Sequence, residues 1–199
     1  MVRVLISTIY EGRANKIAIK ELSPHKLIIV ANEKSDLTQH KAISELREFY
    51  KDTMDIEVLR TSVYDIYKIV KDVISKVDNE TKKGNEVAIH VSEGRKTLFL
   101  ATLFAAYLRK EKIKGAYYVI EETSALLSLP LLDLGLRDTK RKMLQEIIRG
   151  NDNINKLIRK LRVKKTMVYT HINDLKKEGY LINDKRLLEP TDFGKICLL

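Results

Sequence analysis

The run VSEGRKT, residues 91–97, places a hydroxyl group, a glycine and two cations within a few positions of one another. A short apolar run precedes it and a longer apolar segment follows it. That order predicts a buried strand, a tight turn at Gly94 and a buried helix. Such a junction aims backbone N–H groups and the positive end of a helix at one point. Because Arg95 and Lys96 add two full charges there, we expect the junction to bind a phosphate-bearing ligand.

The same residues also fit a plain strand-to-helix turn, in which Ser92 caps the helix and Lys96 is solvated. Glu93 would repel a phosphate unless its carboxylate turned away. The sequence has no GxGxxG after its first apolar run and no GxxxxGK[ST], which argues against NAD binding and P-loop ATP hydrolysis. In the loop at 8–13, Tyr10 and Arg13 either stack on a base or belong to an ordinary surface loop.

Strand-like and helix-like segments alternate through residues 1–130. This alternation predicts an α/β domain with a Rossmann-like, doubly wound parallel sheet, whose ligand lies where the strand order reverses. If the first and fourth strands pair, the loops at 8–13 and 92–97 become neighbours in one site. Strands are predicted at 2–7, 25–31, 54–59, 86–90, 115–121 and within 125–132, and helices at 14–22, 38–51, 63–77 and 98–108.

Composition sets the class of protein. The 199 residues have room for one medium domain and one small one, and the net charge is +10. Residues 1–137 hold 22 Lys+Arg and 19 Asp+Glu, whereas residues 138–199 hold 15 and 8, so +7 of the charge lies in the last third. A basic module of this kind suits a nucleic-acid backbone. The alternative, a Lys-rich thermophile surface, would raise Glu together with Lys, and the last third is poor in Glu.

Several classes are excluded on sequence grounds. No apolar run reaches about 18 residues, so we expect no membrane span. The start, MVRVLISTIY, reads directly as a strand and not as a signal peptide, which predicts a cytoplasmic protein. One cysteine and four histidines without HExxH spacing predict neither a disulfide nor a metal site, and we expect no bound cofactor.

Residues 138–199 follow a connector at 131–137 and predict three helices and a hairpin. The first helix runs from a cap at Asp138 or Thr139 to Arg149, with Leu144, Ile147 and Ile148 inward. Asn153 caps the second, the third covers 165–178, a hairpin turns at 183–185, and Thr191 caps a last short helix. This order is typical of a winged helix-turn-helix.

The third of these helices has a polar face suited to the DNA major groove, where Asn reads adenine and Thr or Tyr reaches phosphate or a thymine methyl. Lysines flank that face, and two cations follow at the wing. Lys164 stands where Ser or Thr often caps, so we expect a weaker cap. The alternative is a solvated face on a protein-binding winged helix. The predicted DNA contacts are Lys164, Lys165, Thr166, Tyr169, Thr170, Asn173, Lys177, Lys185 and Arg186.

The arrangement resembles the CRISPR-associated transcription regulators that join an N-terminal CARF domain to a C-terminal winged helix-turn-helix. The resemblance covers the whole chain and rests on domain order, on Ser7-Thr8 closing the first strand, and on Ser92-x-Gly94-Arg95-Lys96 closing the fourth. Glu93 departs from the family, where Gly is commoner at that place.

The resemblance implies a homodimer whose two Rossmann-like (CARF) domains, residues 1–130, bind one cyclic oligoadenylate, with cyclic tetra-adenylate as the expected ring. The two winged helices, residues 138–199, would bind palindromic double-stranded DNA, and ligand would change that affinity. The implied ligand contacts are Ser7, Thr8, Tyr10, Glu11, Arg13, Ser92, Glu93, Gly94, Arg95, Lys96 and Thr97.

Two other functions fit the same residues. In a ring nuclease, a ribose 2′-OH of the ligand would attack the adjacent phosphate. Lys96 or Arg95 would stabilise the charge that develops on this phosphate, and Ser7 or Thr8 would position the phosphate. Apart from Glu11 and Glu93, neither loop offers an obvious base, so no catalytic residue is assigned. The third function is a metabolic repressor that binds another phosphorylated ligand on this scaffold.

Overall fold

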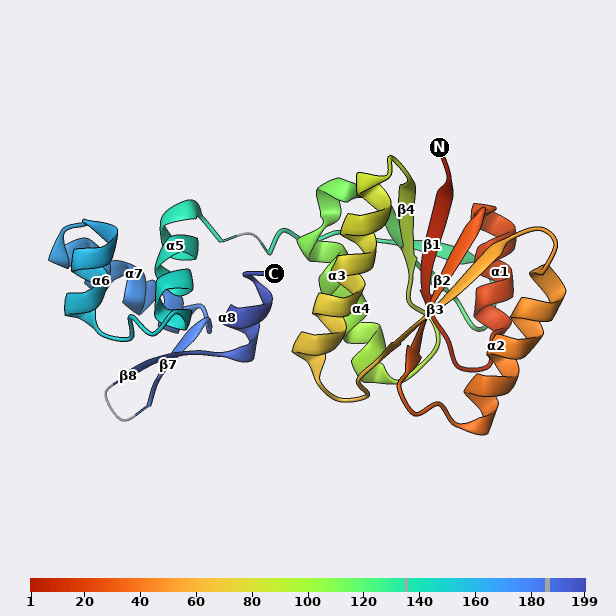
Figure 1. Ribbon diagram of the computed structural model, residues 1–199, viewed down its shortest axis with the longest axis horizontal. Helices are drawn as coiled ribbons and strands as arrows, with labels where there is room; N and C mark the ends of the chain where they lie inside the picture. The colour runs from red at the N-terminus through yellow and green to blue at the C-terminus, as the bar shows by residue number, and fades with distance from the viewer. Residues whose placement is uncertain (135, 185–186) are drawn as a thin grey trace. The chain divides into compact units, whose positions relative to one another are not determined.

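The computed structural model describes residues 1–134, 136–184 and 187–199, and it describes Asp184 by its backbone alone. The chain divides into two compact units, Met1–Asp133 and Leu134–Leu199 (Figure 1). Within the described ranges, no helix combines the length and the apolar character that crossing a bilayer requires.

The first unit is an open six-stranded sheet in the order β3-β2-β1-β4-β5-β6. Strands β1 to β5 are parallel and β6 is antiparallel to β5, so the prediction of a mainly parallel α/β sheet is confirmed. The first and fourth strands do pair, which is the condition under which the loops at 8–13 and 92–97 become neighbours. The elements are β1 (Arg3–Thr8), α1 (Arg13–Leu22), β2 (Lys26–Asn32), α2 (Leu37–Tyr50), β3 (Asp55–Thr61), α3 (Ile66–Lys82), β4 (Glu86–His90), α4 (Lys96–Leu108), η1 (Lys110–Lys112), β5 (Ile113–Val119) and β6 (Leu126–Leu129).

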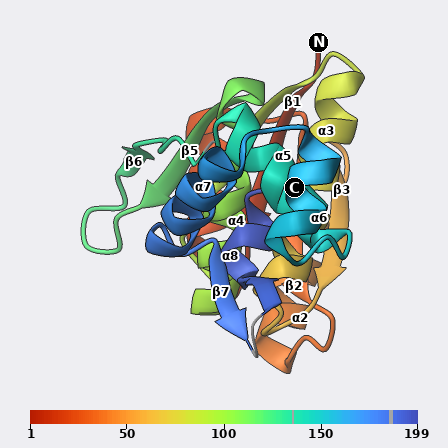
Figure 2. The ribbon, with the colours of Figure 1, turned by 90° about the vertical axis from the view of Figure 1, so that its left-hand side faces the viewer.

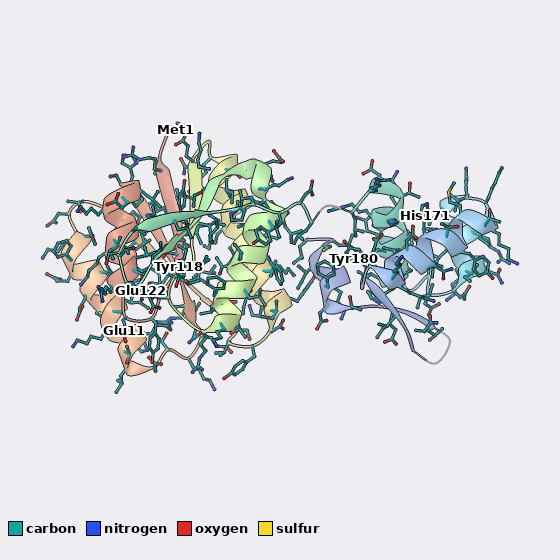
Figure 3. The ribbon with its side chains drawn as sticks, turned by 180° about the vertical axis from the view of Figure 1, so that it is seen from behind. Met1, Glu11, Tyr118, Glu122, His171 and Tyr180 are labelled. Carbon is teal, nitrogen blue, oxygen red and sulfur yellow. The ribbon has the colours of Figure 1, made fainter. Side chains whose placement is uncertain are left out.

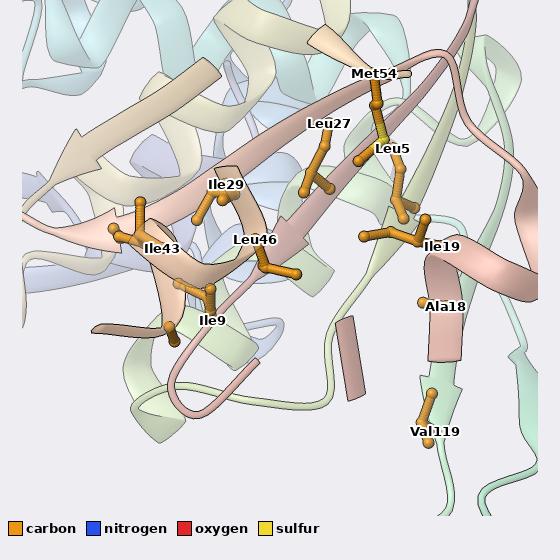
Figure 4. Close-up of a cluster of buried hydrophobic side chains, with 12 residues drawn as sticks. Leu5, Ile9, Ala18, Ile19, Leu27, Ile29, Ile43, Leu46, Met54 and Val119 are labelled. Carbon is orange, nitrogen blue, oxygen red and sulfur yellow. The ribbon is translucent and has the colours of Figure 1, made fainter. Parts of the chain in front are cut away.

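Burial on both faces explains why the central strands are apolar throughout. Helices α1 and α2 cover one face of the sheet, and α3 and α4 cover the other (Figure 1). On the α1–α2 face, Leu5, Leu27 and Ile29 of the strands pack against Ile19 and Leu46 of the helices (Figure 4). Continuous apolar strands are what a parallel sheet covered on both sides requires.

Capping decides where two helices of this unit begin. The Asp36 side chain accepts a hydrogen bond from the Gln39 N–H at the start of α2. Asp65 does the same for the Lys68 N–H at the start of α3. The helix predicted from Val63 therefore begins at Ile66, because the capping residue holds extended backbone angles.

The second unit contains α5 (Asp138–Ile148), α6 (Ile154–Leu161), α7 (Lys165–Lys177), β7 (Leu181–Asp184), β8 (Leu187–Pro190) and α8 (Asp192–Ile196) (Figure 2). Strands β7 and β8 pair antiparallel. The predicted caps at Asn153 and Thr191 are confirmed, since each side chain accepts a backbone N–H of its helix. The core gathers Leu157 of α6 and Val168, Ile172 and Leu175 of α7 around Met143 and Leu144.

Two predictions for α5 are wrong. The helix begins at Asp138 itself, with Arg137 at the N-cap and no side-chain cap bond, so neither Asp138 nor Thr139 caps it. Ile148 was expected inward but is 46% exposed, whereas Met143 is fully buried. The buried face therefore runs through Met143, Leu144 and Ile147, which share one side of a helix with 3.6 residues per turn.

Candidate functional site

A pocket of about 350 Å³ opens where the strand order of the first unit reverses. The chain leaves β1 toward β2 and leaves β4 toward β5, so the two loops that follow these strands diverge to opposite faces of the sheet. Parallel strands place such loops at their carboxyl ends. The pocket is lined by these loops, by the start of α1, and by the end of β5 with its following turn. The lining residues are Tyr10, Glu11, Arg13, Ala14, Ile17, Ser92, Glu93, Gly94, Val119, Ile120, Glu121 and Ser124.

A buried hydrogen-bond chain ties the pocket wall to the sheet. The His90 ring lies between two serines, with Nδ1 at 2.7 Å from Ser7 Oγ and Nε2 at 2.6 Å from Ser92 Oγ. The Asn15 amide donates to Ser7 Oγ at 2.6 Å, and the Val119 N–H donates to Ser92 Oγ at 2.7 Å. Ser92, a pocket residue, is thereby fixed on both sides.

The protonation of His90 follows from its surroundings. Burial lowers the pKa of His90 to about 4, so the ring is neutral at physiological pH. A neutral ring donates from one nitrogen and accepts at the other. Protonation at Nδ1 gives both ring nitrogens and both serine hydroxyls a partner: Ser92 donates to Nε2, Nδ1–H donates to Ser7, and Ser7 donates to the Thr8 carbonyl oxygen at 3.3 Å.

The Glu93 carboxylate turns into the loop after β1. It accepts hydrogen bonds from the N–H groups of Tyr10 (3.0 Å), Gly12 (2.5 Å) and Ala14 (2.6 Å). Those amides surround the beginning of α1, whose N-cap Gly12 offers no side chain and whose first turn carries no acidic residue. Glu93 therefore joins the two loops of the pocket and supplies the missing cap of α1 from the other loop.

In the part of the chain that the structure describes, no side chain caps the first turn of α4 as Glu93 caps α1. Arg95 is its N-cap and makes no side-chain cap bond, and no acidic residue lies in that turn. Arg95 and Lys96 are exposed. The alternative in which Ser92 caps the helix is wrong, because α4 begins at Lys96 and the Ser92 hydroxyl bonds with His90. Gly94 makes the turn possible with φ +97°.

The structure brings six of the predicted ligand residues into the pocket lining, namely Tyr10, Glu11, Arg13, Ser92, Glu93 and Gly94. It places Ser7 and Thr8 behind the wall, where both are fully buried. Arg95 and Lys96 lie outside the lining and are exposed. The Thr97 hydroxyl donates to the Val63 carbonyl oxygen at 2.6 Å, which anchors α4 and not a pocket wall.

The sequence did not predict the third wall of the pocket, which is the turn after β5. It also did not predict the buried residues that support the loops after β1 and β4. The turn after β5 contributes Ile120, Glu121 and Ser124, and Figure 3 labels Glu11 and Glu122 on the two loops at this end of the sheet. The signal available in the sequence was that this turn also follows the carboxyl end of a parallel strand. His90 and Asn15 carry no motif, and only their placement beside Ser7 reveals their role.

In the second unit, the outer face of α7 is polar and exposed. Thr166, Tyr169, Thr170 and Asn173 are all exposed, and so are Lys164, Lys165 and Lys177. The Lys165 ammonium lies 5.9 Å from the centre of the Tyr169 ring. Lys164 makes no side-chain cap bond, which confirms the expected weak cap. The predicted wing contacts Lys185 and Arg186 lie outside the described residues.

The strand order and the pocket define the class of the first unit: a doubly wound α/β domain with a pocket at the point where the order reverses, which is where such domains bind their ligands. A family model described as "HFX_2341_N:-like, N-terminal" matches residues 5–124, and the chain belongs to that family. No curated protein matches the chain.

The solved structures that resemble the chain include the following three. Csm6 from Enterococcus italicus, bound to cyclic hexa-2′-fluoro-hexa-dAMP, has a TM-score of 0.53 at 11% identity over 90% of this chain. Can2 from Sulfobacillus thermosulfidooxidans, in complex with cyclic tetra-adenylate, has a TM-score of 0.51 at 11% identity over 98%. Protein VC1899 from Vibrio cholerae has a TM-score of 0.51 at 10% identity over 98%. This chain spans 56%, 63% and 64% of those chains, and at such identities the likeness is one of fold.

Proposed function

We propose that the protein is a homodimeric, CRISPR-associated transcription regulator that binds cyclic oligoadenylate in its first unit and DNA through its second. The observation that carries this proposal is the pocket at the strand-order reversal, beside an uncapped helix start that bears Arg95 and Lys96. Two proteins of similar fold were solved with cyclic adenylates bound. Cyclic tetra-adenylate is the expected ring.

In this proposal the ligand's phosphates lie at the first turn of α4. The N–H groups of that turn and the two cations attract phosphate, and their effect adds because they point at the same place. Tyr10 and Arg13 of the opposite loop contact sugar or base, with Tyr10 offering a ring for stacking. Ser7 and Thr8 lie behind the pocket wall and act on ligand binding indirectly, by holding the loops in position.

An apolar stripe on α4 supports the homodimer. Leu100 is 42% exposed, and Leu103, Phe104 and Tyr107 are partly exposed. Their spacing of three, four and seven residues places them on one face of the helix. A second copy that packs on this stripe buries it and brings the two uncapped helix starts into one basin, which a ring with two-fold symmetry fills.

The second unit is proposed to be a winged helix-turn-helix, with α7 as the recognition helix. Its helices, hairpin and short last helix follow the order of that motif, and the exposed face of α7 carries Tyr169 and Asn173 among lysines. In the proposal Asn173 reads a base edge and the lysines contact phosphates. Lys185 and Arg186 stay predicted contacts of the wing.

The DNA arm is tested with a duplex selected by the wild-type protein from a random pool. Tyr169→Ala combined with Asn173→Ala removes two side chains from the proposed recognition face and no charge, so specific affinity should fall at least roughly tenfold while the salt dependence stays nearly the same. Lys195→Ala, on α8, is the control and should bind as wild type does. Equal binding by the double variant would remove α7 from the recognition role.

The ligand arm is tested by a thermal-shift panel of cyclic oligoadenylates and common nucleotides. Stabilisation by a cyclic oligoadenylate alone supports the proposal, whereas stabilisation by another phosphorylated compound alone favours a metabolic repressor. Incubation with labelled ring separates binding from cleavage, because a linear product would identify a ring nuclease.

A further inference from the structure

The Glu93 carboxylate lies among backbone amides at the start of α1. Its two carboxylate oxygens receive three backbone N–H groups, those of Tyr10, Gly12 and Ala14, at 2.5–3.0 Å. Three convergent amides at the positive end of a helix form the kind of concavity that binds phosphate or sulfate in proteins. Here the carboxylate occupies that concavity from within the chain.

The local sequence gives α1 no other cap. Gly12 holds φ +82° at the N-cap, has no side chain, and is buried against Ala42. The exposed cation Arg13 opens the helix, at the end where positive charge is unfavourable. The charge that offsets these features comes from the loop 79 to 83 residues further along the chain.

We propose that the Glu93 carboxylate is a resident anion, meaning an anion that the chain itself supplies to the amides of Tyr10, Gly12 and Ala14 (the α1 seat). It positions the loop of Tyr10 and Arg13 against the pocket, and it keeps ligand phosphates out of the α1 seat. As a consequence, phosphates are directed to the first turn of α4, which has no cap and carries two cations. Glu93 is thus a positioning and specificity-determining residue. The last step rests on the proposed function, whereas the occupied seat does not.

The seat is tested in the full-length protein by hydrogen exchange of individual amides, followed by NMR, with inorganic sulfate as the probe. In wild type the amides of Tyr10, Gly12 and Ala14 should be protected and indifferent to sulfate. Glu93→Ala empties the seat, so these amides should exchange roughly tenfold faster or more, because hydrogen bonds to a charged acceptor are lost. Millimolar sulfate should then restore their protection, relative to chloride at equal ionic strength.

Glu93→Gln is the matched control. Gln fills the same space without charge, so protection should be intermediate and sulfate should have no effect. A merely structural cap would not produce this difference between the two variants. Sulfate that leaves Glu93→Ala unchanged would overturn the proposal, and so would Glu93→Gln amides as protected as those of wild type. The second result is decisive even where Glu93→Ala does not fold.

The outcome separates this inference from the proposed function. Sulfate rescue without any binding of cyclic oligoadenylate would retain the resident anion and reject the ligand. Binding of the ring without sulfate rescue would retain the ligand and reject the resident anion.

Discussion

Protonation of His90 should destabilise the first unit in mildly acidic solution, at a higher pH than protonation of the carboxylates does. The ring is fully buried between two serines, and burial lowers its pKa from 6.5 to about 4. Because the folded-state pKa lies below the unfolded one, the unfolded chain binds the proton more tightly. The stability from this group is therefore complete above the unfolded pKa and is lost as the pH falls toward the folded one.

The magnitude follows from these two values. With 1.36 kcal/mol for each unit of pKa difference, the opening free energy of β1 and β4 should drop by about 2 kcal/mol between about pH 8 and about pH 5. The carboxylates with lowered pKa values lose their contribution at lower pH. Glu80 is one of these carboxylates. Burial would raise its pKa, but hydrogen bonds from Lys83, Asn85 and Lys26 outweigh burial and lower the pKa from 4.5 to about 2.

The assay is native-state hydrogen exchange of the Ile6 and Ile89 amides in the full-length protein, corrected for the intrinsic pH dependence of exchange. His90→Gln keeps a polar group between the serines and does not titrate. Wild type should lose about 2 kcal/mol more than this variant over the same range. Parallel loss in both proteins would refute the assignment of a buried, neutral His90 beneath the pocket.

Substitutions at three further positions test the local geometry. Gly94→Ala should cost about 1–2 kcal/mol in thermal unfolding, because φ is +97° and the new Cβ would lie 3.3 Å from the Ile9 carbonyl oxygen; wild-type stability would mean that the turn is different. Gly194→Ala should cost about 2–3 kcal/mol in the second unit, since its Cβ would meet the Tyr180 carbonyl oxygen, and a neutral effect would contradict that contact. Asn153→Ala should cost about 1 kcal/mol through loss of the α6 cap, and Asn153→Ser should restore most of it if the cap is the cause.

The fold was predictable where the chain is locally consistent. Apolar runs such as Leu27–Val30 predicted the buried strands, and the alternation with amphipathic helices predicted the parallel sheet. The pairing of β1 with β4 entered the sequence argument as a condition, and the structure meets it. The antiparallel β6 was harder, because a four-residue strand carries little pattern. At α5, an acidic residue looked like a cap but lies inside the first turn.

The site was predictable as two loops and not as a set of contacts. Loop position after parallel strands indicated where Tyr10, Ser92 and Gly94 would gather. The partners of Glu93 could not be predicted, since they are backbone amides in another loop. The same holds for His90, whose bond to Ser7 joins residues 83 positions apart and depends on the register of β1 with β4.

Calorimetric titration with cyclic tetra-adenylate decides whether two copies of the chain bind one ring. We expect saturable binding of one ring per two chains, weakened at least roughly tenfold by Arg95→Ala with Lys96→Ala, because two charge-assisted phosphate contacts are lost. Lys71→Ala with Lys82→Ala removes the same charge from exposed positions of α3 and should leave binding intact. Absence of binding by wild type, or equal binding by both double variants, would contradict the account.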